Sequence, residues 1–214
     1  MSLADLLTYV GGSGAAVVEV EGPSGAGKST LIRALVAASG PGARCVDVAA
    51  AESVPDEPMQ LVGDLMRAMP ARLEPLEAAF LFCARTAGRC RVIGRLGRGG
   101  PVILLADRLR LSLYAQLRRA GLEVSAAAEL TLLAARKVRP HLTILLDVDH
   151  AEHSRRVTHR GHVPTREREF RALRGWLCEA FDTLGADGPR LDTTGLTPEQ
   201  VRDRVVATGV MPAL

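Results

Sequence analysis

The segment from Gly22 to Ser29 fits the phosphate-binding pattern G-x-x-x-x-G-K-[ST] without a mismatch. Glycines in such a loop let successive backbone N–H groups face one phosphate, and the helix that follows points its positive end at the same place. Lys28 would add a full charge near the β- and γ-phosphates, and the Ser29 hydroxyl would bind Mg²⁺. We therefore expect ATP and Mg²⁺ to bind here. The residues expected to contact the nucleotide are Gly22, Ser24, Gly25, Ala26, Gly27, Lys28, Ser29 and Thr30.

A second chemical group is the pair Asp107-Arg108, which directly follows the apolar run 101–106. At the end of a buried strand facing the phosphate loop, the Asp107 carboxylate would hold Mg²⁺ together with Ser29, or position the acceptor. The plainer interpretation is that Asp107 caps the helix after the strand. Arg108 would reach an anionic group of a substrate, or else be a solvated helix residue. We predict both as catalytic residues, together with Lys28.

The pattern along the chain predicts the scaffold that gathers these residues. Short apolar runs, typical of buried strands, alternate with helical stretches, and this alternation predicts an α/β fold with a parallel sheet covered on both faces. Ligands of such sheets bind at the carboxyl ends of the strands, where the phosphate loop, residues 47–52 and Asp107 all fall. The five expected strands lie at residues 17–20, 44–48, 101–106, 142–148 and 190–192.

Several helices are predicted around this sheet. One is expected at residues 2–10 and one at residues 59–69, and a last helix would begin with Thr197 as its N-cap. The longest, at residues 73–94, is expected to turn one apolar stripe toward the core. The members of that stripe are Leu76, Phe80, Cys83, Ala84 and Ala87.

Composition narrows the class of protein. The chain has 214 residues and a net charge of +3, which suits one domain over residues 1–214. Its arginines are interleaved with acids, so we expect no nucleic acid partner. No apolar run is long enough to span a bilayer, which predicts no membrane partner. The four cysteines form no C-x-x-C pair, a pattern typical of reduced thiols in a cytoplasmic protein.

Several motifs together resemble one family of P-loop kinases. The segment from Asp107 to Gln116 resembles the D-R-Y-x-x-S-x-x-A-Y-Q signature of thymidylate kinases, and Glu21-Gly22 resembles the E-G that opens their phosphate loop. Residues 139–148 are similar to the family's P-D-L-T-x-x-L-D-V segment. The resemblance implies a three-layer P-loop kinase fold, an ATP-dependent phosphotransferase that acts on a nucleoside monophosphate such as dTMP, and a homodimer.

The resemblance also implies an arginine-rich lid at about residues 156–170. In the family, a phosphate loop without an internal basic residue is paired with arginines from the lid. Arg156, Arg160, Arg166 and Arg168 are the candidates, with Arg160 as the catalytic one, and Arg156 and Arg160 are predicted to bind ATP. For at least two of the four, a plain solvated helix surface is the expected alternative.

The acceptor side departs from the family pattern. The R-E-P motif after the second strand is missing, and L-F-x-A-D-R has become the segment 81–86, which keeps Phe82 but ends in Thr86. Arg85, Arg67 or Arg89 would then supply a cation for an acceptor phosphate. The residues predicted to bind the acceptor are Glu52, Phe82, Arg85, Arg108, Tyr114 and Gln116.

Two other functions stay open from the sequence. A kinase for a hydroxyl group of a nucleoside, sugar or antibiotic would need a carboxylate base, and Asp47 or Glu52 occupies the region where related kinases have one. Asp47 would alternatively cap a turn. The third class is a protein that binds ATP without transferring phosphate, against which Asp107 and Arg108 argue together.

Overall fold

The computed structural model describes residues 14–39, 44–51, 62, 65, 73–99, 102–136 and 138–210. The predicted helix at residues 2–10 and the predicted site residue Glu52 lie outside the described residues, as does Arg67. Of the helix predicted at residues 59–69, only Val62 and Leu65 are described.

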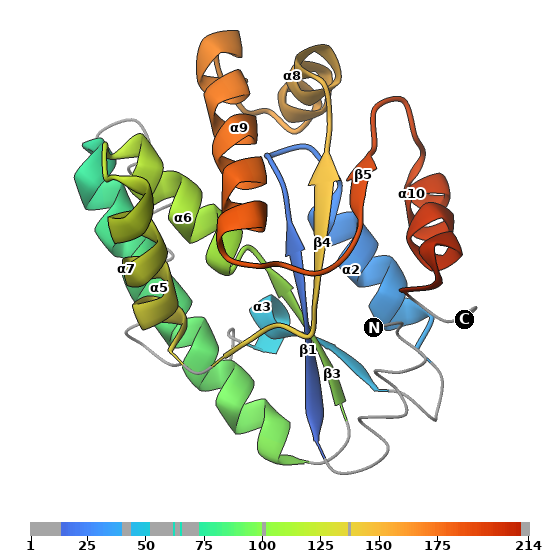
Figure 1. Cartoon of the computed structure of the whole chain (residues 1–214). Coiled ribbons are helices and arrows are strands. Elements are labelled where there is room, and N and C mark those ends of the chain that lie inside the picture. The colour runs from blue at the N-terminus through green and yellow to red at the C-terminus, as the bar shows by residue number, and fades with distance from the viewer. Residues whose placement is uncertain are drawn as a thin grey trace.

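Five parallel strands form one sheet in the order β2-β3-β1-β4-β5 (Figure 1). The central strand β1 pairs with β3 on one side and β4 on the other, with Val20 opposite Asp107 and Glu21 opposite Leu145. The carboxyl end of β3 therefore lies beside the start of the phosphate loop, and the prediction of a five-stranded parallel sheet is confirmed. The strands are β1 (Ala15–Glu21), β2 (Cys45–Asp47), β3 (Val102–Asp107), β4 (Leu142–Asp147) and β5 (Arg190–Asp192).

Helices cover both faces of this sheet (Figure 1). The alternation of side chains along β1 explains the three layers, because Val18 and Val20 pack in a cluster with α2 and α10, whereas Val17 packs in a cluster with α5. The described helices are α2 (Lys28–Ala37), α3 (Val48–Ala51), α5 (Pro75–Leu96), α6 (Arg110–Arg119), α7 (Val124–Ala135), α8 (His150–His159), α9 (Glu167–Thr183) and α10 (Pro198–Val205), with short turns at Gly97–Gly99 and Val206–Val210.

Helix ends follow local chemistry. Thr197 caps α10 as predicted, because its side chain accepts a hydrogen bond from the N–H of Gln200. The second strand is shorter than predicted, since β2 ends at Asp47 and Val48 already begins the helical turn α3.

None of the helices in the described part of the chain is long and apolar enough to cross a membrane.

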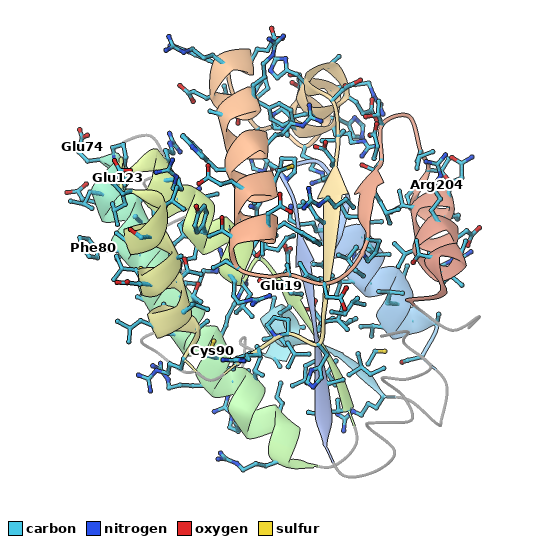
Figure 2. All side chains as sticks on the ribbon, in the orientation of Figure 1. Glu19, Glu74, Phe80, Cys90, Glu123 and Arg204 are labelled. Atoms are coloured by element: carbon cyan, nitrogen blue, oxygen red, sulfur yellow. The ribbon has the colours of Figure 1, made fainter. Side chains whose placement is uncertain are left out.

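The predicted inner face of the longest helix is wrong for Leu76, Phe80 and Ala84, although Cys83 packs against a core cluster. Leu76 is 48% exposed and Phe80 is 62% exposed, and Figure 2 shows Phe80 on the outer side of the helical layer. Helix α5 instead packs through Ala79, Cys90 and Ile93. A helix this long carries apolar residues on more than one stripe, so its rotation depends on packing against α6 and α7, which periodicity alone does not report.

Candidate active site

The phosphate loop connects β1 to α2 and needs its glycines. Gly22, Gly25 and Gly27 all have positive φ angles, of 141°, 80° and 95°. At Gly22 a Cβ atom would lie 2.1 Å from the carbonyl oxygen of Leu146 in the neighbouring strand β4. The loop can therefore leave the sheet and turn into the α2 N-terminus only with glycine at this position.

Lys28, the first residue of α2, is almost completely buried under this loop. Its Nζ donates hydrogen bonds to the carbonyl oxygens of Gly22, at 2.9 Å, and Pro23, at 2.8 Å. Burial, followed by the charge of the nearby Arg108, lowers the pKa of Lys28 to about 7, against the opposing effect of Asp107. A bound polyphosphate would restore the charge of this ammonium group, which suits a residue that recognises phosphate.

Ser29 and Asp107 meet at the edge where β1 and β3 end. The Ser29 hydroxyl donates a 3.0 Å hydrogen bond to Oδ2 of Asp107, and Oδ1 of Asp107 is buried without a hydrogen-bond partner in the described part of the chain. Burial raises the pKa of Asp107, but the charges of Lys28 and Arg108 and the Ser29 hydroxyl outweigh it, so the pKa is lowered. An ionised carboxylate with a free oxygen beside a hydroxyl is a donor set that fits Mg²⁺.

A strained turn places Arg108 next to this pair. Its φ angle is 61°, in the left-handed region that a residue with a side chain rarely adopts. Arg89 of α5, 1% exposed, donates hydrogen bonds to the carbonyl oxygens of both Asp107 and Arg108, the latter at 2.7 Å. Arg89, considered above as a cation for the acceptor, is therefore engaged with the backbone of this turn, and its hydrogen bonds hold the turn in place.

Two buried carboxylates of β1 hold the other side of the same turn. Oε1 of Glu21 accepts hydrogen bonds from the backbone N–H of Leu109, at 2.6 Å, and of Ser112, at 3.2 Å. Glu19, which Figure 2 places in the interior, forms a 3.0 Å ion pair with Arg110. Burial raises the pKa of Glu21 to about 7, with the Glu19 charge as a further cause.

From the sequence, Glu21 served only as a mark of family resemblance, Glu19 was missed, and Arg89 was considered as a cation for the acceptor, not as the residue that holds this turn. A signal was present, because two acids alternate inside an otherwise apolar strand, and a carboxylate buried in a sheet requires partners. Their partners lie about ninety residues away, at the N-terminus of α6. A single sequence gives no indication of that pairing.

Four of the predicted catalytic residues line one small polar cavity. Its volume is about 130 Å³, and its walls include Lys28, Asp107, Arg108 and Arg160. Ser24, Gly25, Gly27 and Ser29 of the phosphate loop complete the lining. Three cationic side chains and one carboxylate thus surround a space beside the loop, which is the arrangement that stabilises a transferring phosphoryl group.

A second cavity, of about 390 Å³, continues from the loop toward α10. Arg160 and Gly27 line both cavities, while Leu196 and Val201 give this one an apolar side. Arg156 is fixed in its wall, because its guanidinium donates to the carbonyl oxygens of Gly25, at 3.0 Å, and Thr193, at 2.8 Å. The cavity therefore combines an apolar side with a fixed guanidinium next to the phosphate loop.

The other two lid arginines lie elsewhere. Arg166 and Arg168 line a third cavity, of about 660 Å³, between α6, α9 and the start of α5. Gln116, predicted to bind the acceptor, also lines it, with Trp176 and Leu173 as apolar walls. The arginine-rich segment therefore places Arg156 and Arg160 at the two cavities beside the phosphate loop, and Arg166 and Arg168 at the third.

Among the described residues, the other predicted acceptor residues Phe82, Arg85 and Tyr114 do not line this cavity, and Arg108 lines the 130 Å³ cavity instead. Tyr114 is fully buried and its hydroxyl donates to Glu179, so its ring belongs to the contact between α6 and α9. Phe82 packs partly buried against the same cluster, and Arg85 lies half-buried on α5. At the end of β2, one oxygen of Asp47 accepts a 2.8 Å hydrogen bond from the N–H of Ala49, which is the turn-capping role named as its alternative.

Solved thymidylate kinases share this architecture. The structure is similar to that of thymidylate kinase from Candida albicans, with a TM-score of 0.66 and 19% identity over 92% of this chain and 92% of that one. The thymidylate kinase from Ehrlichia chaffeensis gives a TM-score of 0.66 and 18% identity, over 91% of this chain and 98% of that one. At sequence identities of 18–19%, this structural similarity shows only that the chain has the same fold.

Family membership comes from the sequence. No curated protein sequence matches this chain. The family model described as thymidylate kinase matches residues 20–185, from the phosphate loop to the end of α9, so the resemblance drawn from the motifs is confirmed. The chain therefore belongs to the thymidylate kinase family, whose members are ATP-dependent kinases that phosphorylate nucleoside monophosphates such as dTMP.

Proposed function

We propose that this chain transfers the γ-phosphoryl group of ATP to the phosphate of dTMP or a related nucleoside monophosphate, through the residues of the 130 Å³ cavity. The observation that carries these roles is that Lys28, Asp107, Arg108 and Arg160 line one polar space beside the phosphate loop. Phosphoryl transfer requires positioning and charge neutralisation more than covalent chemistry by the protein. The cavity offers both.

Each residue of this cavity has its own role in the transfer. An ionised phosphate oxygen of the acceptor attacks the γ-phosphorus, and the bond from that phosphorus to the oxygen of the departing ADP breaks. Lys28 and the loop N–H groups hold the triphosphate, while Arg108 and Arg160 stabilise the charge on the group in transit. Ser29 and Asp107 would hold Mg²⁺, which neutralises phosphate charge when bound.

The nucleoside of ATP occupies the 390 Å³ cavity in this proposal. Its apolar side formed by Leu196 and Val201 suits a base, and Arg156 is held beside the loop by four carbonyl and hydroxyl acceptors. Because those bonds fix the guanidinium, its flat face is available for stacking without further ordering.

The acceptor nucleoside occupies the 660 Å³ cavity. Leu173 and Trp176 form apolar walls, Gln116 supplies an amide, and Arg119 and Arg166 add cations that suit a phosphorylated ligand. This arrangement replaces the family's missing acceptor contacts by residues of α6, α9 and the lid segment.

The hydroxyl-kinase hypothesis is weakened by the place of Asp47. A general base needs a carboxylate oxygen free to take a proton from the acceptor. Asp47 caps a turn through the Ala49 N–H and does not line the 130 Å³ cavity, so neither of its oxygens faces the group to be transferred. A phosphate acceptor needs no such base, because its oxygens are ionised at neutral pH.

We further propose that two copies associate through the outer face of α5. The exposed Leu76 and Phe80 lie on this face, and Leu132 and Leu133 are exposed on the adjacent α7. Light scattering on the purified chain would show a dimer, and Phe80→Glu would convert it to a monomer.

A screen of acceptors tests the function. Purified chain with Mg-ATP is given dTMP, other nucleoside monophosphates, nucleosides or sugar-like alcohols, and ADP release is followed. We expect turnover with a nucleoside monophosphate and its loss in Lys28→Ala. Turnover restricted to unphosphorylated acceptors would contradict the proposal, as would the same ADP release from Lys28→Ala.

A further inference from the structure

His153 of α8 connects two parts of the active site that are far apart in sequence. Its side chain is completely buried. Nδ1 of the imidazole lies 2.8 Å from the carbonyl oxygen of Ser24 in the phosphate loop. Nε2 accepts a 3.3 Å hydrogen bond from the backbone N–H of Thr165, in the segment between α8 and α9.

These two partners fix the protonation state of the ring. A carbonyl oxygen can only accept, so Nδ1 must carry a proton, and a backbone N–H can only donate, so Nε2 must be bare. Both bonds therefore exist together only in the neutral tautomer with hydrogen on Nδ1. A second proton on Nε2 would face the Thr165 N–H and break the second bond.

Thr165 is held from a second direction. Nε2 of His150, one turn before His153, lies 2.9 Å from the Thr165 carbonyl oxygen. The ring of Phe170 packs against both imidazoles, with centroids 5.4 Å from that of His150 and 4.4 Å from that of His153. Both backbone polar groups of Thr165 are thus bound by histidines of α8, above the carboxyl ends of the strands (Figure 1).

The segment held in this way includes Arg160. At its start, the N–H of Arg160 donates a 3.1 Å hydrogen bond to the carbonyl oxygen of Val157, and its other end is fixed at Thr165. Arg160 and Ser24 line the same 130 Å³ cavity. His153 is bonded to Ser24 on one side and to the end of the Arg160 segment on the other.

We propose that His153 is a positioning residue, which ties the phosphate loop to the segment 160–166 and so sets the place of Arg160 relative to the phosphates. The proposal rests on the role given to Arg160 in the proposed function. His153 lines none of the cavities described above, so it acts through Ser24 and Thr165. With the tie intact, Arg160 stays over the loop and water is kept from the γ-phosphate.

The surroundings of the imidazole keep it neutral. Burial lowers the pKa of His153, while the Ser24 carbonyl opposes this, and His150 and Lys28 lower the pKa further. On the α9 side it meets the uncharged Phe170, and the Arg174 guanidinium lies 6.0 Å from the centroid of the Phe170 ring. Because the pKa of His153 is lowered, both hydrogen bonds are present at neutral pH, and the bond to Thr165 is lost only at a pH below the ordinary histidine pKa.

Two substitutions separate the two bonds. His153→Asn places an amide N–H near the position of Nδ1 and keeps the bond to Ser24, but it has nothing near Nε2. His153→Gln places an amide oxygen near the position of Nε2 and keeps the bond to Thr165, but it loses Ser24. The matched control is His159→Asn, an exposed histidine at the end of the same helix.

The experiment compares these variants in phosphate transfer to dTMP, in ATP hydrolysis without acceptor and in melting temperature. We expect His153→Asn and His153→Gln each to lower kcat about tenfold, the effect of one lost hydrogen bond. The KM for ATP should stay within about twofold, and the fraction of ATP lost to water should rise. His159→Asn should match the wild type in all of these measurements. The kcat of the wild type should fall as the pH is lowered into the acidic range, whereas the kcat of His153→Asn should not change with pH in that range.

Readouts that need no acceptor keep this proposal separate from the proposed function. Nitrogen chemical shifts of the imidazole should show hydrogen on Nδ1 of His153 at neutral pH. A wild-type chain that phosphorylates no nucleotide would contradict the proposed function alone. Hydrogen on Nε2 of His153 would overturn the present proposal, as would variants that melt lower but keep the wild-type kcat, pH profile and hydrolysis ratio.

Discussion

The hydroxyl of Ser29 and Oδ2 of Asp107 lie 3.0 Å apart, although 78 positions separate them in the chain. The contact exists because β1 and β3 are parallel neighbours, so the loop that follows one strand meets the last residue of the other. Together with Oδ1 of Asp107, which has no hydrogen-bond partner among the described residues, this contact marks the place where Mg²⁺ would be held.

Loss of either partner should weaken the use of Mg²⁺. We expect Ser29→Ala and Asp107→Asn each to lower kcat/KM by about 10²-fold, and Asp107→Asn to raise the Mg²⁺ concentration needed for half-maximal activity. Activity titrated with Mg²⁺ measures both effects. Asp192→Asn, an exposed aspartate at the end of β5, is the control and should be unchanged. An Asp107→Asn enzyme with the wild-type Mg²⁺ requirement would contradict this assignment.

Gly22 and Gly94 should respond to alanine in opposite directions. Gly22→Ala puts a methyl group 2.1 Å from the Leu146 carbonyl at a positive φ, so we expect it to destabilise the fold by at least about 1–3 kcal/mol. Gly94 lies exposed inside α5 with nothing within 4 Å of the added carbon, and alanine there should stabilise by about 0.5–1 kcal/mol. Urea unfolding of both variants tests the signs, and destabilisation by Gly94→Ala would contradict the described packing of α5.

Glu21 should make stability depend on pH. Burial, followed by the Glu19 charge, raises its pKa from 4.5 to about 7 in the folded state. The folded state therefore holds a proton that the unfolded chain releases, so the stability linked to Glu21 is fully present below pH 4.5 and is lost as the pH rises through about 7.

Glu21→Gln isolates this effect, because glutamine does not titrate. Urea unfolding of the wild type and the variant should show their free energies of unfolding shifting in favour of the variant as the pH rises across that window. A difference that stays constant with pH would mean that the carboxyl group is already ionised in the folded state.

Substitutions in the acceptor cavity should change the KM for one substrate and not for the other. Gln116→Ala and Trp176→Ala remove one polar and one apolar wall of the 660 Å³ cavity. We expect each to raise the KM for the nucleoside monophosphate about tenfold while the KM for ATP is unchanged. Arg171→Gln, on the exposed side of α9, should leave both constants alone. A larger effect on the KM for ATP would place the wrong nucleotide in this cavity.

Much of the donor side could be predicted from the sequence because its chemistry is local. The phosphate loop is a continuous segment whose glycines and lysine have fixed positions, and Asp107 directly follows an apolar strand. The rule that ligands meet the carboxyl ends of parallel strands then brings the two together. The capping of α10 by Thr197 was equally local, and it too is as predicted.

The rest depends on contacts between distant segments. Arg89 holds the turn at Arg108 from another helix, and His153 bonds a loop about 130 positions away, so neither role is visible in the local pattern. The rotation of α5, which exposes Phe80, is decided by its packing on α6 and α7. Tyr114 has the right type of side chain for a substrate site, but its helix turns it into the core.

The most direct test of the central claim identifies the phosphorylated product. Chain, Mg-ATP and dTMP are incubated, and the product is analysed by phosphorus NMR for the wild type, Lys28→Ala and Asp47→Asn. We predict a diphosphate made from dTMP, its loss in Lys28→Ala, and a rate within about threefold of the wild type in Asp47→Asn. Phosphate found on a hydroxyl group, with Asp47→Asn slower by orders of magnitude, would contradict the account.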